Sequence, residues 1–245
     1  MVAQGKKEFV LCTWNLGHFS KGQKPYTVIN GISFNSTLQE FLSVLNDSIQ
    51  ADVICFNEYN KTFGVDEFGQ KKMTKDLALS KYRYVEVGPL MGFSCNAIFS
   101  SFVIRNVKLR KFEISETVAS MMPRAQNYYY LECDLYYNRE KIKLICAHTT
   151  SSASAICQSQ ISELMNRYRN DDRVVMCGDW NTQDYSLFRN SGYSIGNNGS
   201  YKTYPSKNYA LDNIAVKGLV ISDTKQIKTS ISDHNPLLCR ITFID

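Results

Sequence analysis

The chain of 245 residues carries a formal net charge of +5, with 44% hydrophobic and 21% charged residues. This length suits one large α/β domain rather than two ordinary domains with a linker, so we expect a single domain over residues 1–245. The composition excludes a disordered or repeat protein, and no apolar run is long enough to form a transmembrane segment. The mild positive charge tolerates a phosphate-bearing partner, although Lys and Arg are scattered rather than clustered.

The eight cysteines are not spaced as metal ligands, because no Cys-x-x-Cys pair occurs. Most of them lie in apolar runs and are interpreted as buried thiols, which favours a reducing compartment. No signal peptide precedes the first predicted strand, which begins at Glu8. We therefore expect a cytoplasmic monomer, with secretion as the alternative if a signal peptide has been removed.

Short strand-like runs outnumber helical segments along the chain. The predicted strands are Glu8 to Trp14, Val53 to Phe56, Tyr82 to Val87, Ala97 to Phe99, Lys108 to Ile114, Tyr128 to Leu135, Lys141 to Ala147, Val174 to Cys177, Leu211 to Val216 and Leu237 to Phe243. A first helix is predicted by apolar residues at helical spacing from Leu38 to Ile49, behind a capping box of Thr37 and Glu40. A second is predicted from Ala155 to Tyr168.

Each predicted helix follows a strand that ends in a polar residue and precedes a buried strand that ends in a carboxylate. The first half has Asn15 and Glu58 at these ends, and the second has His148 and Asp179. Two halves of one plan predict two mixed sheets packed face to face with helices outside, a four-layered α/β sandwich. The polar strand ends would then gather at one rim. The segments 60–75, 117–127 and 187–205 are predicted as loops near it.

The residues at these strand ends are acids, amides and two imidazoles, with no Ser or Cys nucleophile beside a His. They are Asn15, Glu58, His148, Asp179, Asn181, Asp212, Asp233 and His234. Hard oxygen ligands of this kind suit Mg²⁺, which one or two carboxylates commonly hold while several waters remain for phosphate to replace. The pattern therefore indicates metal-assisted attack of water on phosphorus.

Seven segments in register from Cys12 to Pro236 carry a resemblance to a known family. They are Thr13-Trp14-Asn15, Asp52 to Glu58, Asn96 to Ser100, Ala147-His148-Thr149, Gly178-Asp179-Trp180-Asn181, Leu211 to Ile214 and Ser232 to Pro236. In this order the chain resembles the endonuclease/exonuclease/phosphatase superfamily, which includes deoxyribonuclease I-like nucleases, inositol-polyphosphate phosphatases and neutral sphingomyelinases. The resemblance implies a deoxyribonuclease I-like fold and a Mg²⁺-dependent phosphoric ester hydrolase, with Mn²⁺ as the alternative metal.

The resemblance also implies roles for individual residues. Glu58 would be the main metal ligand, assisted by Asn15, while Asp233 would be a second-metal or supporting carboxylate or a purely structural one. Asp179 would position or deprotonate the attacking water. His234, oriented by Asp212, would act as general base or as a cationic stabiliser of charge on phosphorus.

The remaining implied roles concern the phosphate. Asn181 would donate to a phosphate oxygen, and His148 would contact a phosphate oxygen or protonate the leaving group. Abasic-site endonucleases usually carry another residue type at the position of His148, which counts against that branch. The family usually has Arg or Lys where this chain has Ser101. Arg124 is therefore a candidate phosphate-binding cation, with an ordinary surface residue as the alternative.

Three functions remain as hypotheses. The first is a metal-dependent phosphodiesterase acting as an endonuclease or exonuclease. The second is a phosphatase or phosphodiesterase acting on inositol phosphates or, like a sphingomyelinase, on a phospholipid head group. The third is a binding protein that keeps the fold without turnover, which no site motif favours. The sequence leaves the substrate open, because specificity in such folds lies in rim loops.

Overall fold

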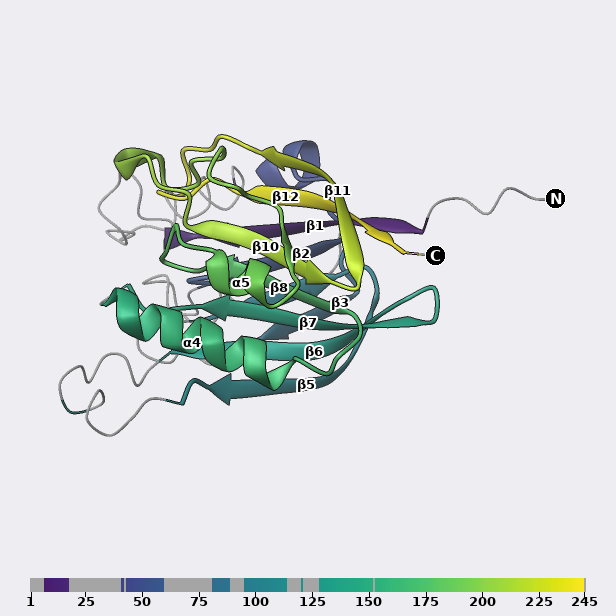
Figure 1. Ribbon diagram of the computed structural model, residues 1–245. Coiled ribbons are helices and arrows are strands. Elements are labelled where there is room, and N and C mark those ends of the chain that lie inside the picture. Colours follow the sequence, from purple (N-terminus) through teal and green to yellow (C-terminus); the bar gives the residue numbers. More distant parts are fainter. Residues whose placement is uncertain are drawn as a thin grey trace.

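The computed structural model describes residues 7–17, 41, 43–59, 81–88, 95–113, 120, 128–151 and 153–244. These residues form two six-stranded sheets (Figure 1). The first sheet contains, in spatial order, β11 (Leu219–Gln226), β12 (Leu237–Phe243), β1 (Glu8–Asn15), β2 (Val53–Asn57), β4 (Ala97–Ser100) and β3 (Tyr84–Val87). The second contains β5 (Val103–Lys111), β6 (Tyr129–Tyr137), β7 (Glu140–His148), β8 (Val174–Asp179), β10 (Asp212–Lys217) and β9 (Ser194–Ile195).

Both sheets are mixed, and each contains one parallel pair. In the first sheet β1 pairs in parallel with β2, and in the second β7 pairs in parallel with β8, while the other pairings are antiparallel. Helix α4 (Ser154–Arg167) connects β7 to β8, and the helical turn Val44–Ser48 lies between β1 and β2. The prediction of two halves with one plan is therefore confirmed.

The core has three apolar layers, which the alternation of side chains on the strands dictates. Between the sheets, Leu11 and Cys55 of the first sheet and Leu144 of the second are fully buried. Fully burying a leucine contributes about 1.5–3 kcal/mol. On the outer face of the first sheet, Phe41 packs against Trp14, with ring centroids 5.5 Å apart.

The outer face of the second sheet is covered by α4 and by α5 (Ser186–Asn190), as Figure 1 shows. Ile161 and Leu164 of α4 are buried in one cluster with Ile145 of β7 and Phe188 of α5. Helices and sheets thus follow the predicted sandwich, helix on sheet on sheet on helix. Among the residues that the structure describes, no helix has the length and hydropathy of a membrane-spanning segment.

The predicted helices differ little from the structure where it describes them. The second runs from Ser154 to Arg167 instead of Ala155 to Tyr168. In the first, Phe41 is helical and Val44–Ser48 form a π-helical turn, in which the amide of Ile49 donates to the Val44 carbonyl over 2.9 Å. The proposed capping box of Thr37 and Glu40 lies outside the described residues, as do residues 60–75 and all of 117–127 except Ser120.

Two features of the strands and one loop prediction need correction. Strand β5 begins at Val103 rather than Lys108, because a bulge between Arg105 and Lys108 interrupts the alternation that marks a strand in sequence. Strand β11 was not predicted, because this edge strand presents charged residues such as Asp223 to solvent. The loop prediction over 187–205 is wrong in part, because the segment contains most of α5 and the two-residue strand β9.

All eight cysteines are free and buried, which confirms their interpretation as thiols.

Candidate active site

The strand order brings the polar strand ends to one edge of the two sheets. The C-terminal ends of β1 and β7 face the same side, at the left of Figure 1. Strand β8 pairs with β7 so that His148 lies opposite Asp179, and β10 runs antiparallel to β8 so that Asp212 also lies opposite Asp179. Side chains from both sheets therefore meet at this rim.

Asp179 is the centre of the cluster, and its carboxylate is 2% exposed. Its Oδ2 accepts a hydrogen bond from Asn15 Nδ2 at 2.9 Å and lies 3.6 Å from His148 Nε2 and 3.7 Å from His234 Nε2. Its Oδ1 accepts from the backbone amide of Asn181 at 2.9 Å. Burial opposes ionisation, but the charges of His234 and His148 and these hydrogen bonds hold the pKa of Asp179 below its usual range. Asp179 is therefore an ionised carboxylate facing two imidazoles.

His234 is paired with Asp212, as the family resemblance implies. His234 Nδ1 lies 2.7 Å from Oδ2 of Asp212, whose side chain is fully buried. Burial works against the imidazolium, but the charges of Asp212 and Asp179 outweigh it and raise the pKa of His234 to about 10. The backbone of His234 is also held in place, since its amide donates to Ser232 Oγ at 3.0 Å. At neutral pH this histidine is a cation whose Nδ1–H donates to Asp212.

Glu58 and His148 form the more open side of the cluster. Glu58, 21% exposed, accepts from Asn15 Nδ2 at 3.2 Å and lies 3.9 Å from His148 Nε2. Its φ of +51° is unusual for a residue with a side chain, as is the +47° of Asn181. Such backbone strain collects at functional sites, where the surrounding structure imposes it. Among the described residues, the buried Nδ1 of His148 has no hydrogen-bond partner.

Two side chains that are predicted to bind a metal or a phosphate already form hydrogen bonds within the protein. The Asn15 side-chain oxygen accepts from the amide of Gly17 at 2.9 Å, so its amide nitrogen is the group that faces Glu58 and Asp179. The Asn181 side-chain nitrogen donates to the Thr149 carbonyl at 2.8 Å, which leaves its second N–H for a ligand. Metal binding by Asn15 and phosphate binding by Asn181 stay predictions.

Asp233 lies against the turn after β1 rather than beside Asp179. A Cβ atom on Gly17, whose φ is +51°, would come within 2.2 Å of Asp233 Oδ1, so this close approach requires glycine. Burial lowers the pKa of His234, and the Asp233 charge raises it, though less than the charges of Asp212 and Asp179 do. Its assignment to a metal stays a prediction, and Arg124 lies outside the described residues.

Three of these residues form a group that could hold a metal ion. The potential ligand atoms of Asp179, Asp212 and His234 lie within 4.8 Å of one another, and all three residues are buried. The imidazolium of His234, however, offsets the charge of one of the two carboxylates and offers no lone pair to a cation. Glu58, on the open side, is 21% exposed and lies 3.9 Å from His148 Nε2.

Asn57, for which no role was predicted, links the two sheets beneath the site. This fully buried residue donates to Asn96 Oδ1 at 2.8 Å and to the Ala147 carbonyl at 2.9 Å. Its Oδ1 accepts from the amide of Asp179 at 2.8 Å. A Cβ atom at Gly178 would lie 1.8 Å from the Ala147 oxygen, so glycine is required for the strands to approach this closely. Asn57 thereby fixes Glu58, its neighbour, relative to Asp179.

We expect Asn57→Leu to lower the free energy of unfolding by about 1–3 kcal/mol, because it leaves the Asp179 amide and the Ala147 carbonyl buried without partners. Urea unfolding followed by circular dichroism measures this loss. Asn46→Leu, on an exposed position of the helical turn, is the matched control and should change stability by no more than about 0.5 kcal/mol. Equal effects of the two substitutions would contradict a bridging role.

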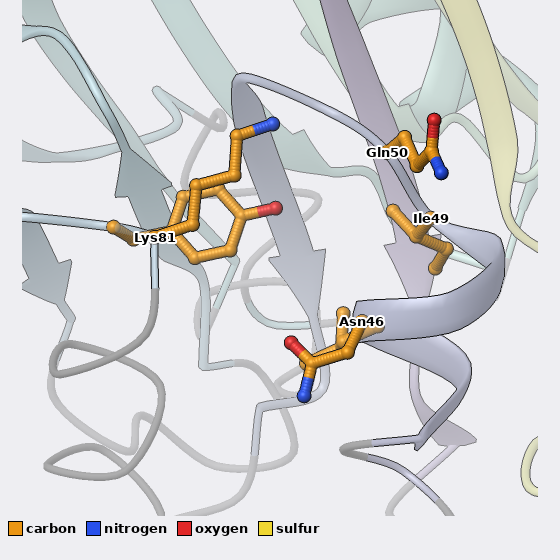
Figure 2. Close-up of a pocket in the computed structure, with 6 residues that line it drawn as sticks. Asn46, Ile49, Gln50 and Lys81 are labelled. Carbon is orange, nitrogen blue, oxygen red and sulfur yellow. The ribbon is translucent and has the colours of Figure 1, made fainter.

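A cavity of about 300 Å³ lies away from this rim, at the start of β2. It is lined by Leu45, Asn46, Ile49, Gln50, Lys81 and Tyr82. Figure 2 shows Lys81 on one side and Asn46, Ile49 and Gln50 on the other. The Lys81 ammonium and the Tyr82 hydroxyl both donate to the Ala51 carbonyl, at 2.6 and 3.0 Å. Its polar groups thus anchor the backbone, and the acid–imidazole chemistry lies at the opposite end of β2.

Comparisons with known proteins agree with this arrangement. The model of the endonuclease/exonuclease/phosphatase family matches residues 12–234. No protein with a curated description matches the sequence significantly.

Several solved structures share the fold at low sequence identity. An endonuclease/exonuclease/phosphatase from Beutenbergia cavernae DSM 12333 matches with a TM-score of 0.72 and 12% identity, covering 97% of this chain and 72% of that one. TDP2 from D. rerio, solved with a single-strand DNA product, gives 0.68 and 14%, covering 96% and 98%. Sphingomyelinase C from Streptomyces griseocarneus gives 0.62 and 12%, covering 97% and 99%.

These likenesses establish the deoxyribonuclease I-like fold, while the family model extends over nearly all of the chain, from the first sheet to His234. The chain therefore belongs to the endonuclease/exonuclease/phosphatase family of phosphoester hydrolases.

Proposed function

We propose that this protein is a divalent-metal-dependent phosphodiesterase that cleaves nucleic acid. One observation carries the proposal. Side-chain nitrogen atoms of Asn15, His148 and His234, from different strands and loops, lie 2.9–3.7 Å from Asp179 Oδ2. An ionised carboxylate between two imidazoles supplies both a water-orienting group and donors for phosphate oxygens. The net charge of +5 suits a polyanionic substrate.

Asp179 and His234 have different proposed roles because their charges differ. The lowered pKa of Asp179 keeps it ionised, so that it orients the attacking water through a hydrogen bond and takes up its proton. The pKa of about 10 makes His234 a cation rather than a base at neutral pH. This favours electrostatic stabilisation of the charge that develops on the phosphate oxygens. Asp212 is a positioning residue that holds the imidazolium.

His148 and Asn181 complete the proposed site. His148 Nε2 faces the open side beside Glu58, where it contacts a phosphate oxygen or gives a proton to the leaving oxygen. Asn181 offers its remaining N–H to a phosphate oxygen. In support of this role, the backbone of Asn181 has a positive φ and its amide donates to Asp179 Oδ1, while its side chain donates to the Thr149 carbonyl.

A divalent cation fits the Glu58 side of the cluster on grounds of charge. The carboxylates of Glu58, Asp179 and Asp212 meet two imidazoles here, and the charge of Asp212 is already matched by His234. Glu58 is the proposed principal ligand of Mg²⁺ or Mn²⁺, with Asn15 and Asp233 as supporting candidates. When bound, such an ion supplies Lewis-acid polarisation of a phosphoryl oxygen.

Hydrolysis of bis(p-nitrophenyl) phosphate tests the proposed chemistry. We expect release of p-nitrophenolate with Mg²⁺ or Mn²⁺ and its loss on addition of EDTA, because neither imidazole replaces a Lewis acid. Restoring the metal in excess over EDTA should restore the rate. Hydrolysis that is indifferent to EDTA would contradict metal dependence, and no hydrolysis with either metal would contradict the activity.

Plasmid DNA, RNA, inositol phosphates and sphingomyelin then separate the substrate classes. We expect the nucleic acids to be cleaved, with a rate that falls steeply as salt rises, because phosphate contacts release counter-ions. Sphingomyelinase C shares the fold, so exclusive cleavage of sphingomyelin is the outcome that would transfer the proposal to the phospholipid alternative.

A further inference from the structure

Tyr204 lies directly against the proposed catalytic cation. Its ring centroid is 4.8 Å from that of His234, and the two rings are inclined by 37°. The other sides of the imidazole are already used, since Nδ1 bonds Asp212 and Nε2 faces Asp179. Tyr204 therefore covers a face of His234 at the edge of the reacting centre. An aromatic ring over an imidazolium also favours its charge.

The backbone of Tyr204 is held in place by hydrogen bonds within the protein. Tyr204 and Tyr209 exchange two backbone hydrogen bonds of 2.9 and 3.1 Å around the short 3₁₀ turn Pro205–Lys207. Next to Tyr204, the hydroxyl of Thr203 accepts from the amide of Asp212 at 3.0 Å. The Thr203 carbonyl accepts from the amide of Asn235 at 2.7 Å. The residue before Tyr204 is thus tied to Asp212 and to Asn235, which follows His234 in the chain.

Part of Tyr204 remains accessible to a ligand. Thr203 is fully buried, whereas Tyr204 is half-buried, and its hydroxyl has no hydrogen bond to the described residues. Lys207, on the turn that follows, is exposed. An ordered aromatic surface with a nearby cation stacks a flat base at little cost in side-chain entropy. A small alcohol would gain no stacking there.

We propose that Tyr204 forms a wall of a subsite for an aromatic base attached to the scissile phosphate, so that the substrates are nucleoside phosphodiesters. This inference rests on the proposed phosphodiesterase activity. In this arrangement one face of the ring stays on His234 and the accessible part contacts the base. Tyr204 is then a specificity-determining residue beside the reacting atoms.

Three dinucleotides isolate the contribution of the base. They are thymidylyl-(3′→5′)-thymidine and two counterparts in which one or the other thymine is replaced by hydrogen, so that all three contain the same phosphodiester. With Mn²⁺ and chromatographic detection, we expect the wild type to cleave at least one abasic counterpart with a kcat/KM about 5- to 100-fold below that of the parent. In Tyr204→Leu and Tyr204→Gln, the parent and its abasic counterparts should be cleaved with similar kcat/KM values.

Two further variants keep the test specific. Tyr204→Phe retains the stacking ring and should retain the ratio. Tyr209→Leu removes the exposed ring of the paired residue while its backbone hydrogen bonds remain, and should also retain the ratio.

Three results would overturn the inference. They are equal cleavage of all three dinucleotides by the wild type, an unchanged ratio in both Tyr204→Leu and Tyr204→Gln, and no cleavage of any dinucleotide by an enzyme that hydrolyses bis(p-nitrophenyl) phosphate. Failure of the proposed function itself is distinguishable, because bis(p-nitrophenyl) phosphate would then be stable with both metals.

Discussion

Replacing Asp179 by asparagine is expected to lower kcat for bis(p-nitrophenyl) phosphate by about 10²- to 10⁴-fold, the usual contribution of a positioned acid–base group. The substitution keeps the size of the side chain and an oxygen that can accept from the Asn181 amide. It removes the negative charge that faces His148 and His234 and that accepts a proton from water. The loss should therefore fall on turnover, measured at saturating substrate with Mn²⁺.

Asp184→Asn is the matched control for this variant. Asp184 is an exposed carboxylate on the loop after β8, and it accepts from the amide of Ser186 at 3.0 Å. Because it lies outside the cluster, its substitution should leave kcat unchanged within about twofold, since surface substitutions change little. Wild-type turnover in Asp179→Asn, with near-ultraviolet circular dichroism showing native packing, would remove Asp179 from the mechanism.

The residues around Asp179 were predictable because their signal is local. Asn15, His148 and Asp179 each end an apolar strand, and the carboxyl ends of parallel neighbouring strands share one edge of a sheet. The pairing of His234 with Asp212, instead of the adjacent Asp233, was predictable only through the family resemblance. The fold followed from the same information, since two strand–helix–strand units of one plan predict two sheets.

Other features could not be read from sequence, because they depend on long-range geometry. Asn57 has partners 39, 90 and 122 residues away, so nothing near it in the chain marks it as a bridge. In the sequence, nothing distinguishes Tyr204 from an ordinary aromatic residue in a loop, and only the folded structure shows its ring against His234. Likewise, the engagement of the Asn15 oxygen by Gly17 depends on the turn that the chain makes after β1.

His234→Gln is expected to lower kcat by about 10²- to 10⁴-fold, because it replaces an imidazolium beside the phosphate by a neutral amide. Asp212→Asn should lower kcat as well, since the imidazole loses both its orientation and the carboxylate that keeps it charged. The two losses should not add, because Asp212 acts through His234, and the double variant tests this. Full additivity would mean that Asp212 has a separate role.

A titration of the metal-free protein in EDTA tests the charge of His234 directly. Burial favours the neutral ring, but Asp212 and Asp179 raise its pKa from the ordinary 6.5 to about 10. Because the pKa is raised on folding, the stabilisation from this pair should be complete below about pH 6.5 and lost as pH rises towards 10. In wild type, the NMR signal of the His234 Cε1 proton should therefore stay at its protonated position through pH 8.

Variants of the two neighbouring carboxylates decide which of them controls that charge. Asp212→Asn removes the negative charge 2.7 Å from His234 Nδ1 and should lower the pKa of His234 more than Asp233→Asn does, since Asp233 contributes only a weaker charge interaction. A larger decrease in the pKa of His234 with Asp233→Asn than with Asp212→Asn would mean that Asp233 keeps the imidazole charged. Asp212 would then have a structural role. With the expected order, His234 enters the reaction as a cation, and Asp179 is left as the carboxylate that handles the proton of the attacking water.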